Sequence, residues 1–154
     1  MKPAYLETIA LIERLHRQCM ELVKTELDRL GVRDLNAVQA MILFNLGDSQ
    51  LTVGELTQRG YYLGSNVSYN VKKMVENGYL HQERSPHDKR ATHLQCSEKG
   101  MEICNRLDEL FDRHARELAN SGVDEGALGT TNDSLQRLEG FWAAARVTGV
   151  SSVA

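Results

Sequence analysis

Cysteine is scarce in this sequence of 154 residues, which contains three of them. The number of cysteines is odd, and no two of them have C-x-x-C spacing; they are Cys19, Cys96 and Cys104. The pattern therefore predicts neither a disulfide framework nor a zinc finger. We expect the three thiols to be reduced and partly buried.

Long hydrophobic runs are missing as well. The longest uncharged stretch, residues 35–47, is too short to span a bilayer and contains Asn36, Gln39 and Asn45. Charged residues also interrupt the first eighteen residues, which therefore do not form the apolar core of a signal peptide. We expect a cytoplasmic protein without membrane contact.

A strong excess of one charge is missing from the whole chain, whose net charge is -3 and whose pI is about 6.0. The sign nevertheless changes along the sequence. Residues 52–96 contain six Lys or Arg and four Asp or Glu, whereas residues 97–154 contain six and ten. A basic middle segment beside an acidic end is consistent with local anion binding.

Patterns typical of enzymes are missing too. Ser85, His87 and Asp88 are the residue types of a hydrolytic triad, but neighbours in a short loop cannot adopt the required geometry. The glycines between residues 122 and 129 are not preceded by a strand, so they do not form a phosphate-binding loop. We expect no catalysis and no cofactor.

The N-terminal part of the sequence has the periodicity of helices. Apolar residues recur at helical spacing from Tyr5 to Leu30, as in a long helix with one wet face. Asn36 and Gln39 have the spacing of a capping box that opens a second helix, which ends at Gly47. This helix is apolar on nearly all sides, so it should be central.

Two short helices joined by a tight turn are predicted for residues 52–78. Thr52 and Glu55 again have capping-box spacing, and in the second helix Ser65 can cap and Gly78 can terminate. The apolar residues of this second helix share one stripe: Val67, Val71, Met74 and Val75. The pair is a helix-turn-helix.

A β-hairpin is predicted directly downstream. The segments "YLHQERS" and "ATHLQCS" alternate, with Leu80 and Leu94 as expected core contacts, and "SPHDKR" supplies turn residues. A long helix should follow, weakened or broken by the glycines of residues 121–133. A last helix should occupy about 134–147, with residues 148–154 as a disordered tail.

A helix-turn-helix followed by a hairpin with a basic tip is a winged helix. Its second helix can lie in the major groove, while the hairpin reaches the backbone or the neighbouring minor groove. Amides and hydroxyls can contact base edges, and ammonium groups can neutralise phosphates. The expected DNA-binding residues are Ser65, Asn66, Ser68, Tyr69, Lys72, Lys73, Arg84, His87, Asp88, Lys89 and Arg90.

Asp88 is an acid within this basic loop. It stands two residues before Arg90, so its carboxylate can accept a hydrogen bond from that guanidinium and fix its direction. An exposed pair of this kind contributes roughly 0–1 kcal/mol to folding. Its expected role is therefore orientation of the arginine.

The order of elements and the stretches "LTVGEL", "GSNVSYNVKKMVENGYL" and "DKRATHLQCSEKG" resemble the MarR family of bacterial transcription regulators over nearly the whole chain. The most specific part is a D-x-R wing followed by a T/S-x-x-G helix start, here Asp88, Arg90, Ser97 and Gly100. Ser97 stands where the family commonly has Thr and keeps the capping hydroxyl. The run "RGYYLGSNVSYN" also resembles the LdtR-type branch, which is associated with cell-wall transpeptidase genes and osmotic stress.

The resemblance implies a mainly α fold with a small β-hairpin wing (α+β). The single domain 1–154 would comprise a winged-helix part, 34–96, and dimerisation helices, 1–30 and 97–147. It implies a homodimer on pseudo-palindromic double-stranded DNA, with half-sites about ten base pairs apart. The apolar stripes of the terminal helices support a dimer, unless they fold back on their own subunit.

A small-molecule effector, often aromatic, is also implied by the resemblance. Its candidate binding residues are His16, Cys19, Phe44, Tyr61 and Tyr62.

Two alternatives remain open at this point, and a third is opposed by the sequence. One is a redox-responsive regulator of the same fold that uses Cys19. Another is a winged-helix module for protein contacts without specific DNA binding. A zinc site at His81, His93 and Cys96 is opposed by the alternation of strand faces, so no metal is expected.

Overall fold

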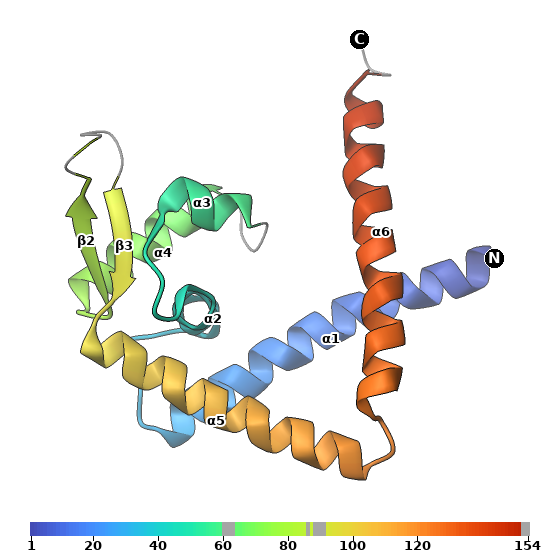
Figure 1. Cartoon of the computed structure of the whole chain (residues 1–154), viewed down its shortest axis with the longest axis horizontal. Helices are drawn as coiled ribbons and strands as arrows, with labels where there is room; N and C mark the ends of the chain where they lie inside the picture. Colours follow the sequence, from blue (N-terminus) through green and yellow to red (C-terminus); the bar gives the residue numbers. More distant parts are fainter. Residues whose placement is uncertain (60–63, 86, 88–91, 152–154) are drawn as a thin grey trace. The chain divides into compact units, whose positions relative to one another are not determined.

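The computed structural model describes residues 1–59, 64–85, 87 and 92–151, without the side chains of 64, 65 and 148–151. It forms two compact units, Met1–Glu109 and Leu110–Ala154, and each is described by itself. The mainly helical fold with a small antiparallel sheet confirms the predicted class (Figure 1). The elements are α1 (Lys2–Arg29), α2 (Ala37–Leu46), β1 (Leu51–Thr52), α3 (Val53–Gln58), α4 (Gly64–Glu76), β2 (Leu80–Arg84), β3 (Thr92–Cys96), α5 (Glu98–Asn120) and α6 (Glu125–Ser151).

Helix α2 is the centre of the first unit, as predicted. Its capping box is complete: the Gln39 amide donates to Asn36 Oδ1 at 2.8 Å, and the Asn36 amide donates to Gln39 Oε1 at 3.1 Å. The helix contacts α1, α4 and β3, and Ile42 and Leu43 are fully buried. Burial on several sides explains why this segment shows almost no polar face in the sequence.

The sheet has three antiparallel strands in the order β1-β3-β2. The hairpin β2–β3 was predicted, but the two-residue strand β1 was not. Leu80 pairs with Cys96, and Leu94 pairs with Gln82 and with Leu51 of β1. The expected place of Leu80 and Leu94 in the core is confirmed, because residues 80, 94 and 96 face the core side of the sheet and are buried.

The core of the first unit lies under α4 and the sheet. Burying each large aliphatic side chain stabilises the fold by roughly 1.5–3 kcal/mol. The N-terminal two thirds of α1 do not contribute in the same way, since Leu6, Leu11, Leu15 and Leu22 are exposed. The side chains that form the centre of this core include Val23, Leu27, Leu56, Val67, Met74, Leu94 and Leu107.

Helix α6 begins at Glu125, about ten residues before the start that the sequence predicted. Asp124 caps it, since Asp124 Oδ1 accepts from the Ala127 amide at 2.9 Å. Gly126 and Gly129 therefore lie inside the helix, and only Gly122, with φ +96°, adopts a left-handed turn between α5 and α6. The helix also continues to Ser151, into the predicted tail 148–154, whose last three residues lie outside the described residues.

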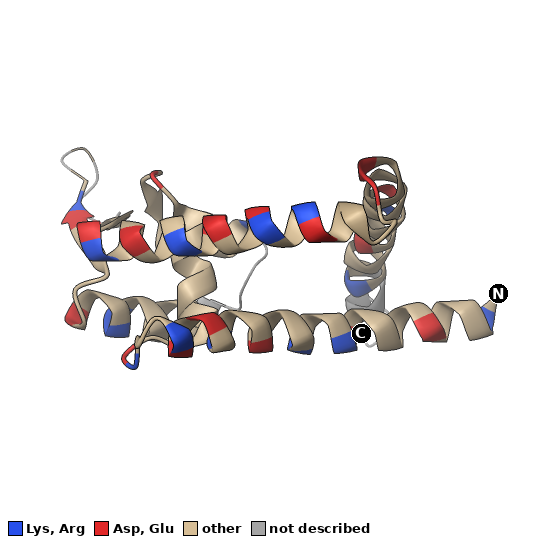
Figure 2. Ribbon diagram, turned by 90° about the horizontal axis from the view of Figure 1, so that it is seen from below, with Lys and Arg blue, Asp and Glu red and all other residues tan. Residues whose placement is uncertain are grey.

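Charges of both signs alternate along α5 (Figure 2). On this helix Arg106 Nη1 lies 3.5 Å from Glu109 Oε2, and both side chains are largely exposed. Such exposed pairs stabilise the fold by at most about 1 kcal/mol. Because acidic and basic side chains are mixed along α5, its exposed surface is not a basic groove. In the described part of the chain, no helix combines the length and apolar character needed to cross a membrane.

Candidate nucleic-acid interface

Helix α4 has a buried face and an exposed face. Val67, Val71 and Met74 are buried against the core, with exposed fractions of 0–3%. The opposite face places five predicted residues in solvent: Asn66, Ser68, Tyr69, Lys72 and Lys73. The side chain of the sixth, Ser65, lies outside the described residues.

The exposed face of α4 carries amide, hydroxyl and ammonium groups of the kinds that can contact a nucleic acid. Tyr69 is 63% exposed, so its ring and hydroxyl are accessible to a partner. Lys73 Nζ lies 3.9 Å from Glu76 Oε2, so its charge is partly balanced on the same helix. Lys72 forms no ion pair with any described residue, which leaves its charge available to a phosphate.

A chain of hydrogen bonds connects α2 to this helix. Gln39 Nε2 donates to Asn70 Oδ1 at 3.2 Å, and Asn70 Nδ2 donates to the Asn66 carbonyl at 2.8 Å. Gln39 also belongs to the capping box with Asn36. The start of α2 is thus linked through two amide side chains to the first turns of α4.

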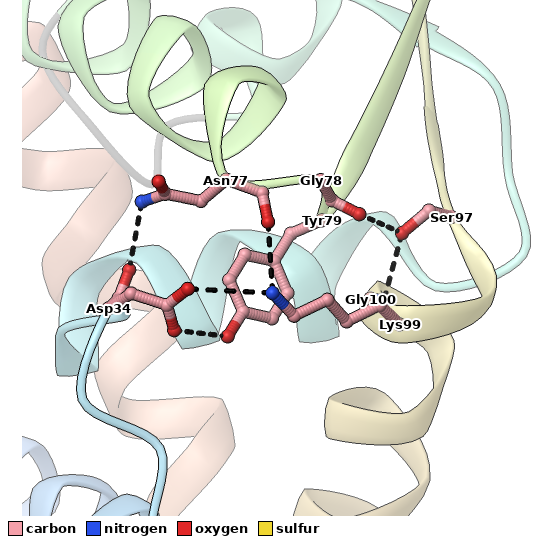
Figure 3. Close-up of polar contacts among 7 residues, drawn as sticks. All are labelled: Asp34, Asn77, Gly78, Tyr79, Ser97, Lys99 and Gly100. Carbon is pink, nitrogen blue, oxygen red and sulfur yellow. Dashed lines mark hydrogen bonds and ion pairs between the residues drawn. The ribbon is translucent and has the colours of Figure 1, made fainter.

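The end of α4 is held by a polar cluster (Figure 3). Gly78 ends the helix with φ +81°, a conformation that favours glycine. Asn77 Nδ2 donates to the Asp34 carbonyl at 3.2 Å, and the Tyr79 hydroxyl donates to Asp34 Oδ1 at 2.5 Å. Lys99 Nζ bridges the same groups, 3.4 Å from Asp34 Oδ2 and 3.0 Å from the Asn77 carbonyl.

In this cluster, the hydrogen bond between Tyr79 and Asp34 shifts the pKa values of both groups. Burial raises the pKa of Tyr79 above its usual value, and the bond to Asp34 raises it further. The bond from Tyr79 holds the pKa of the Asp34 carboxyl below its usual value, with Lys99 adding to this effect. Lys99 Nζ also lies 4.2 Å from the centre of the Tyr79 ring. At neutral pH a neutral phenol therefore donates to an ionised carboxylate.

The start of α5 closes tightly on the same turn. Ser97 Oγ donates to the Gly78 carbonyl at 2.6 Å and accepts from the Gly100 amide at 3.1 Å. A Cβ atom on Gly100 would lie 2.3 Å from the Tyr79 carbonyl oxygen. The predicted cap at Ser97 is therefore confirmed, and the glycine is required because two backbones meet there.

The wing is described up to its tip. Arg84 ends β2 opposite Thr92 of β3, and both Arg84 and His87 are exposed. The His87 amide donates to Ser85 Oγ at 3.3 Å. The remaining predicted wing residues, Asp88, Lys89 and Arg90, lie outside the described residues.

Comparison with known proteins assigns the chain to a family. A sequence model described as the MarR family matches residues 33–91. The transcriptional activator of exopolysaccharide II synthesis ExpG, from Rhizobium meliloti strain 1021, is 37% identical over 146 residues, which cover 95% of this chain and 75% of ExpG. The chain belongs to the MarR family. The resemblance predicted from the sequence motifs is confirmed, and ExpG and other relatives of this MarR-family chain are regulators of transcription, not enzymes.

Solved structures share the MarR-family fold of this chain. FabT of Streptococcus pneumoniae, solved in complex with DNA, has a TM-score of 0.70 at 18% identity and covers 91% of this chain and 98% of its own. The Staphylococcus aureus MepR–DNA complex has a TM-score of 0.70 at 15% identity, covering 86% and 96%. The regulator SlyA has a TM-score of 0.74 at 14% identity, covering 89% and 94%.

A groove of about 610 Å3 lies between the end of α1 and the start of α2 in this MarR-family chain. Its lining comprises Met20, Glu21, Lys24, Leu27, Asp28, Val32, Arg33, Leu35, Asn36, Ala37 and Val38. Of the predicted effector residues, His16 is exposed, and Cys19 and Phe44 are half-buried; none of these three lines the groove. Tyr61 and Tyr62 lie outside the described residues.

The sequence did not indicate the residues that support α4. Gln39 was recognised as a cap, but its bond to Asn70 joins positions 31 residues apart. Asp34, Tyr79 and Lys99 come from three separate segments, and no local spacing marks them as partners. The one available signal was Gly100 in the T/S-x-x-G pattern, which indicates a close approach without naming the backbone that approaches.

Proposed function

We propose that this MarR-family regulator binds double-stranded DNA, with α4 in the major groove and the wing over the neighbouring minor groove. The observation that carries the proposal is the exposed polar face of α4 opposite its buried stripe of Val67, Val71 and Met74. FabT and MepR, which share this fold, were solved with DNA.

A salt series tests this proposal before any operator is known. The affinity of the full chain for random duplex DNA should fall as salt rises, with a logarithmic slope of about -0.9 for each phosphate contacted. The competing function is a winged-helix module for protein contacts. Weak binding that does not change with salt would support that function and contradict the DNA proposal.

The wing proposal rests on Arg90 and Asp88. Arg90→Ala should weaken operator binding while the protein stays folded and keeps its oligomeric state. Asp88→Ala removes a charge that repels phosphate, so simple electrostatics predicts tighter binding. We expect weaker binding instead, because Asp88 orients the Arg90 guanidinium. Unchanged affinity in Arg90→Ala would make the wing assignment wrong.

A homodimer is the second part of the proposal. Leu110 is the one buried residue among the described positions 110–147, whereas Leu128, Leu135 and Phe141 are exposed by 41%, 41% and 63%. In the first unit, α1 exposes four further leucines. Apolar surface of this extent is usually covered by a partner, and a second copy related by a two-fold axis is the commonest one. Two α4 helices would then meet a pseudo-palindromic site.

The third part is modulation by a small aromatic acid bound in the groove. Leu27 and Leu35 offer apolar contact to a ring, and Lys24 and Arg33 offer charge to a carboxylate. Asn36 also lines the groove and is hydrogen-bonded to Gln39, which bonds to α4. An occupant of the groove can therefore change the position of α4 through these amides.

Salicylate, a small aromatic acid, is a suitable probe of the groove and of its connection to α4. We expect Lys24→Ala to weaken salicylate binding, and Asn70→Ala to keep it while losing the effect of salicylate on DNA affinity. The competing location for the effector site is formed by the five residues predicted from the sequence: His16, Cys19, Phe44, Tyr61 and Tyr62. Loss of salicylate binding in Phe44→Leu but not in Lys24→Ala would place the site there and contradict the groove.

A further inference from the structure

Two buried thiols face each other where three elements of the first unit meet. Cys96 ends β3 and Cys104 lies in the second turn of α5, with exposed fractions of 7% and 6%. Both contact the same carbonyl oxygen, that of Leu43 in α2, with Sγ of Cys96 at 3.7 Å and Sγ of Cys104 at 3.0 Å. The two thiols also interact with each other, since each shifts the pKa of the other.

Packing alone does not require this arrangement. A small buried apolar residue would fill either position, and a single buried cysteine commonly does so. Here both sulfur atoms contact the same carbonyl oxygen, that of Leu43, so the two cysteines can bind one ion together. Soft cations prefer such thiolate ligands over oxygen or nitrogen.

We propose that Cys96 and Cys104 form a two-sulfur binding site for a soft monovalent cation of the Cu(I) class. The number of donors selects the ion, because ions of this class accept two thiolates whereas structural zinc requires four ligands. Among the described residues, no three His, Cys, Asp or Glu side chains come together as a metal site. The eight-residue separation of the two cysteines explains why the sequence predicted no such site.

Binding would release both thiol protons to solvent, with no change in oxidation state of sulfur or metal. The interaction between the two thiols lowers the pKa of Cys104 and, together with burial, raises that of Cys96. The Gly47 amide lies near Cys104 and favours its thiolate.

The Leu43 carbonyl oxygen keeps a hydrogen bond when the two thiol protons are released. The Leu43 carbonyl also accepts from the Gly47 amide at 2.9 Å, which is the last bond of α2. Loss of two S–H donors therefore removes contacts between α2 and the β3–α5 junction without leaving a buried carbonyl unpaired. The ion would replace them by a direct link between β3 and α5.

The first test is a competition titration of the reduced full chain under anaerobic conditions, with Cu(I) supplied by the coloured chelator bicinchoninate. We expect one equivalent bound per chain in the wild type, and loss of that binding in Cys96→Ser and in Cys104→Ser. Cys19→Ser is the matched control, since this half-buried thiol on α1 lies outside the pair, and it should keep full binding. Retained binding in either buried variant, or loss in Cys19→Ser, would overturn the proposal.

A second measurement does not depend on the folding of any variant. X-ray absorption at the copper edge of the loaded wild type should give two sulfur neighbours and no nitrogen neighbour. A shell that contains imidazole nitrogen, or a wild type that binds no Cu(I) while all its thiols remain reduced, would contradict a site made by this pair.

Discussion

Gly100 brings the first turn of α5 so near to Tyr79 that a methyl group does not fit between them. In Gly100→Ala the new Cβ would lie 2.3 Å from the Tyr79 carbonyl, which is backbone and cannot turn away. We expect a loss of about 1–3 kcal/mol in the free energy of unfolding, as for other overpacked sites. Urea unfolding followed by circular dichroism measures this loss.

Gly54→Ala is the control for Gly100→Ala. Its Cβ would lie 3.8 Å from the nearest atom, Thr52 Oγ1, which is an ordinary contact. Its stability should therefore stay within about 1 kcal/mol of the wild type, because alanine favours a helix over glycine. Equal losses in the two variants would mean that the close approach at Gly100 does not matter for stability.

Asp34 makes the stability of the fold depend on pH. Its pKa is lowered from 3.8, so its contribution is present above that value and is lost as the pH falls through the folded-state pKa. At pH 7, Asp34→Asn should be less stable than the wild type by about 1 kcal/mol, since the side chain is 47% exposed. The difference should shrink towards zero well below pH 3.8. Urea titrations at the two pH values measure it, and a difference independent of pH would contradict the charged bond.

Local contacts could be predicted from the sequence at this scale, and distant ones could not. The caps at Asn36, Thr52 and Ser97 act on amides within three residues, so their spacing was sufficient evidence. The bonds of Asp34 to Tyr79 and Lys99 span 45 and 65 positions. Such partners are chosen by the packing of whole elements, which no single segment of sequence records.

At the scale of the element, α4 carries two lysines in different surroundings. Lys72→Gln should reduce the salt slope of DNA binding by about one unit, as expected for one lost phosphate contact. Glu76→Gln should strengthen binding to random duplex DNA, because it frees Lys73 from its 3.9 Å ion pair and removes a negative charge. Fluorescence anisotropy across a salt series measures both. An unchanged slope in Lys72→Gln would remove Lys72 from the interface.

Two elements differ from the prediction. The glycines of residues 122–129 indicated a break or a weak point because glycine weakens a helix by about 1 kcal/mol, yet α6 begins at Glu125 after a cap at Asp124 and includes Gly126 and Gly129. Strand β1 has two residues, too few for an alternating pattern, and exists because β3 offers it an edge. Strand β1 therefore depends on a distant neighbour that a local pattern does not contain.

At the scale of the whole molecule, the proposed dimer depends on the apolar surface of α6. Phe141→Glu places a charge on that surface and should weaken the dimer by about 2 kcal/mol or more, as for a central interface residue. This corresponds to roughly a thirtyfold loss of dimer affinity. Light scattering after gel filtration over a range of concentrations measures it. Gln136→Glu adds the same charge at another exposed position of α6 and should leave the dimer intact.

The order of the helices and of the β2–β3 hairpin was predictable because each carries its own periodicity or caps, whereas strand β1 was not predicted. The face of α4 that should meet DNA was also predictable, since its apolar stripe defines the opposite side. The groove beside α1 was not predictable, because it arises between two segments that are each ordinary in sequence.

The most direct test of the central claim is selection of genomic fragments by the full-length protein, followed by footprinting of the selected site. We predict two protected half-sites in a pseudo-palindrome, about ten base pairs apart, as two α4 helices on one face of the duplex require. Asn66→Ala, which removes a group that we propose contacts the bases, should reduce the preference for this site over random DNA by roughly 1–3 kcal/mol. No enrichment of any sequence, or a site without two-fold symmetry, would contradict the account.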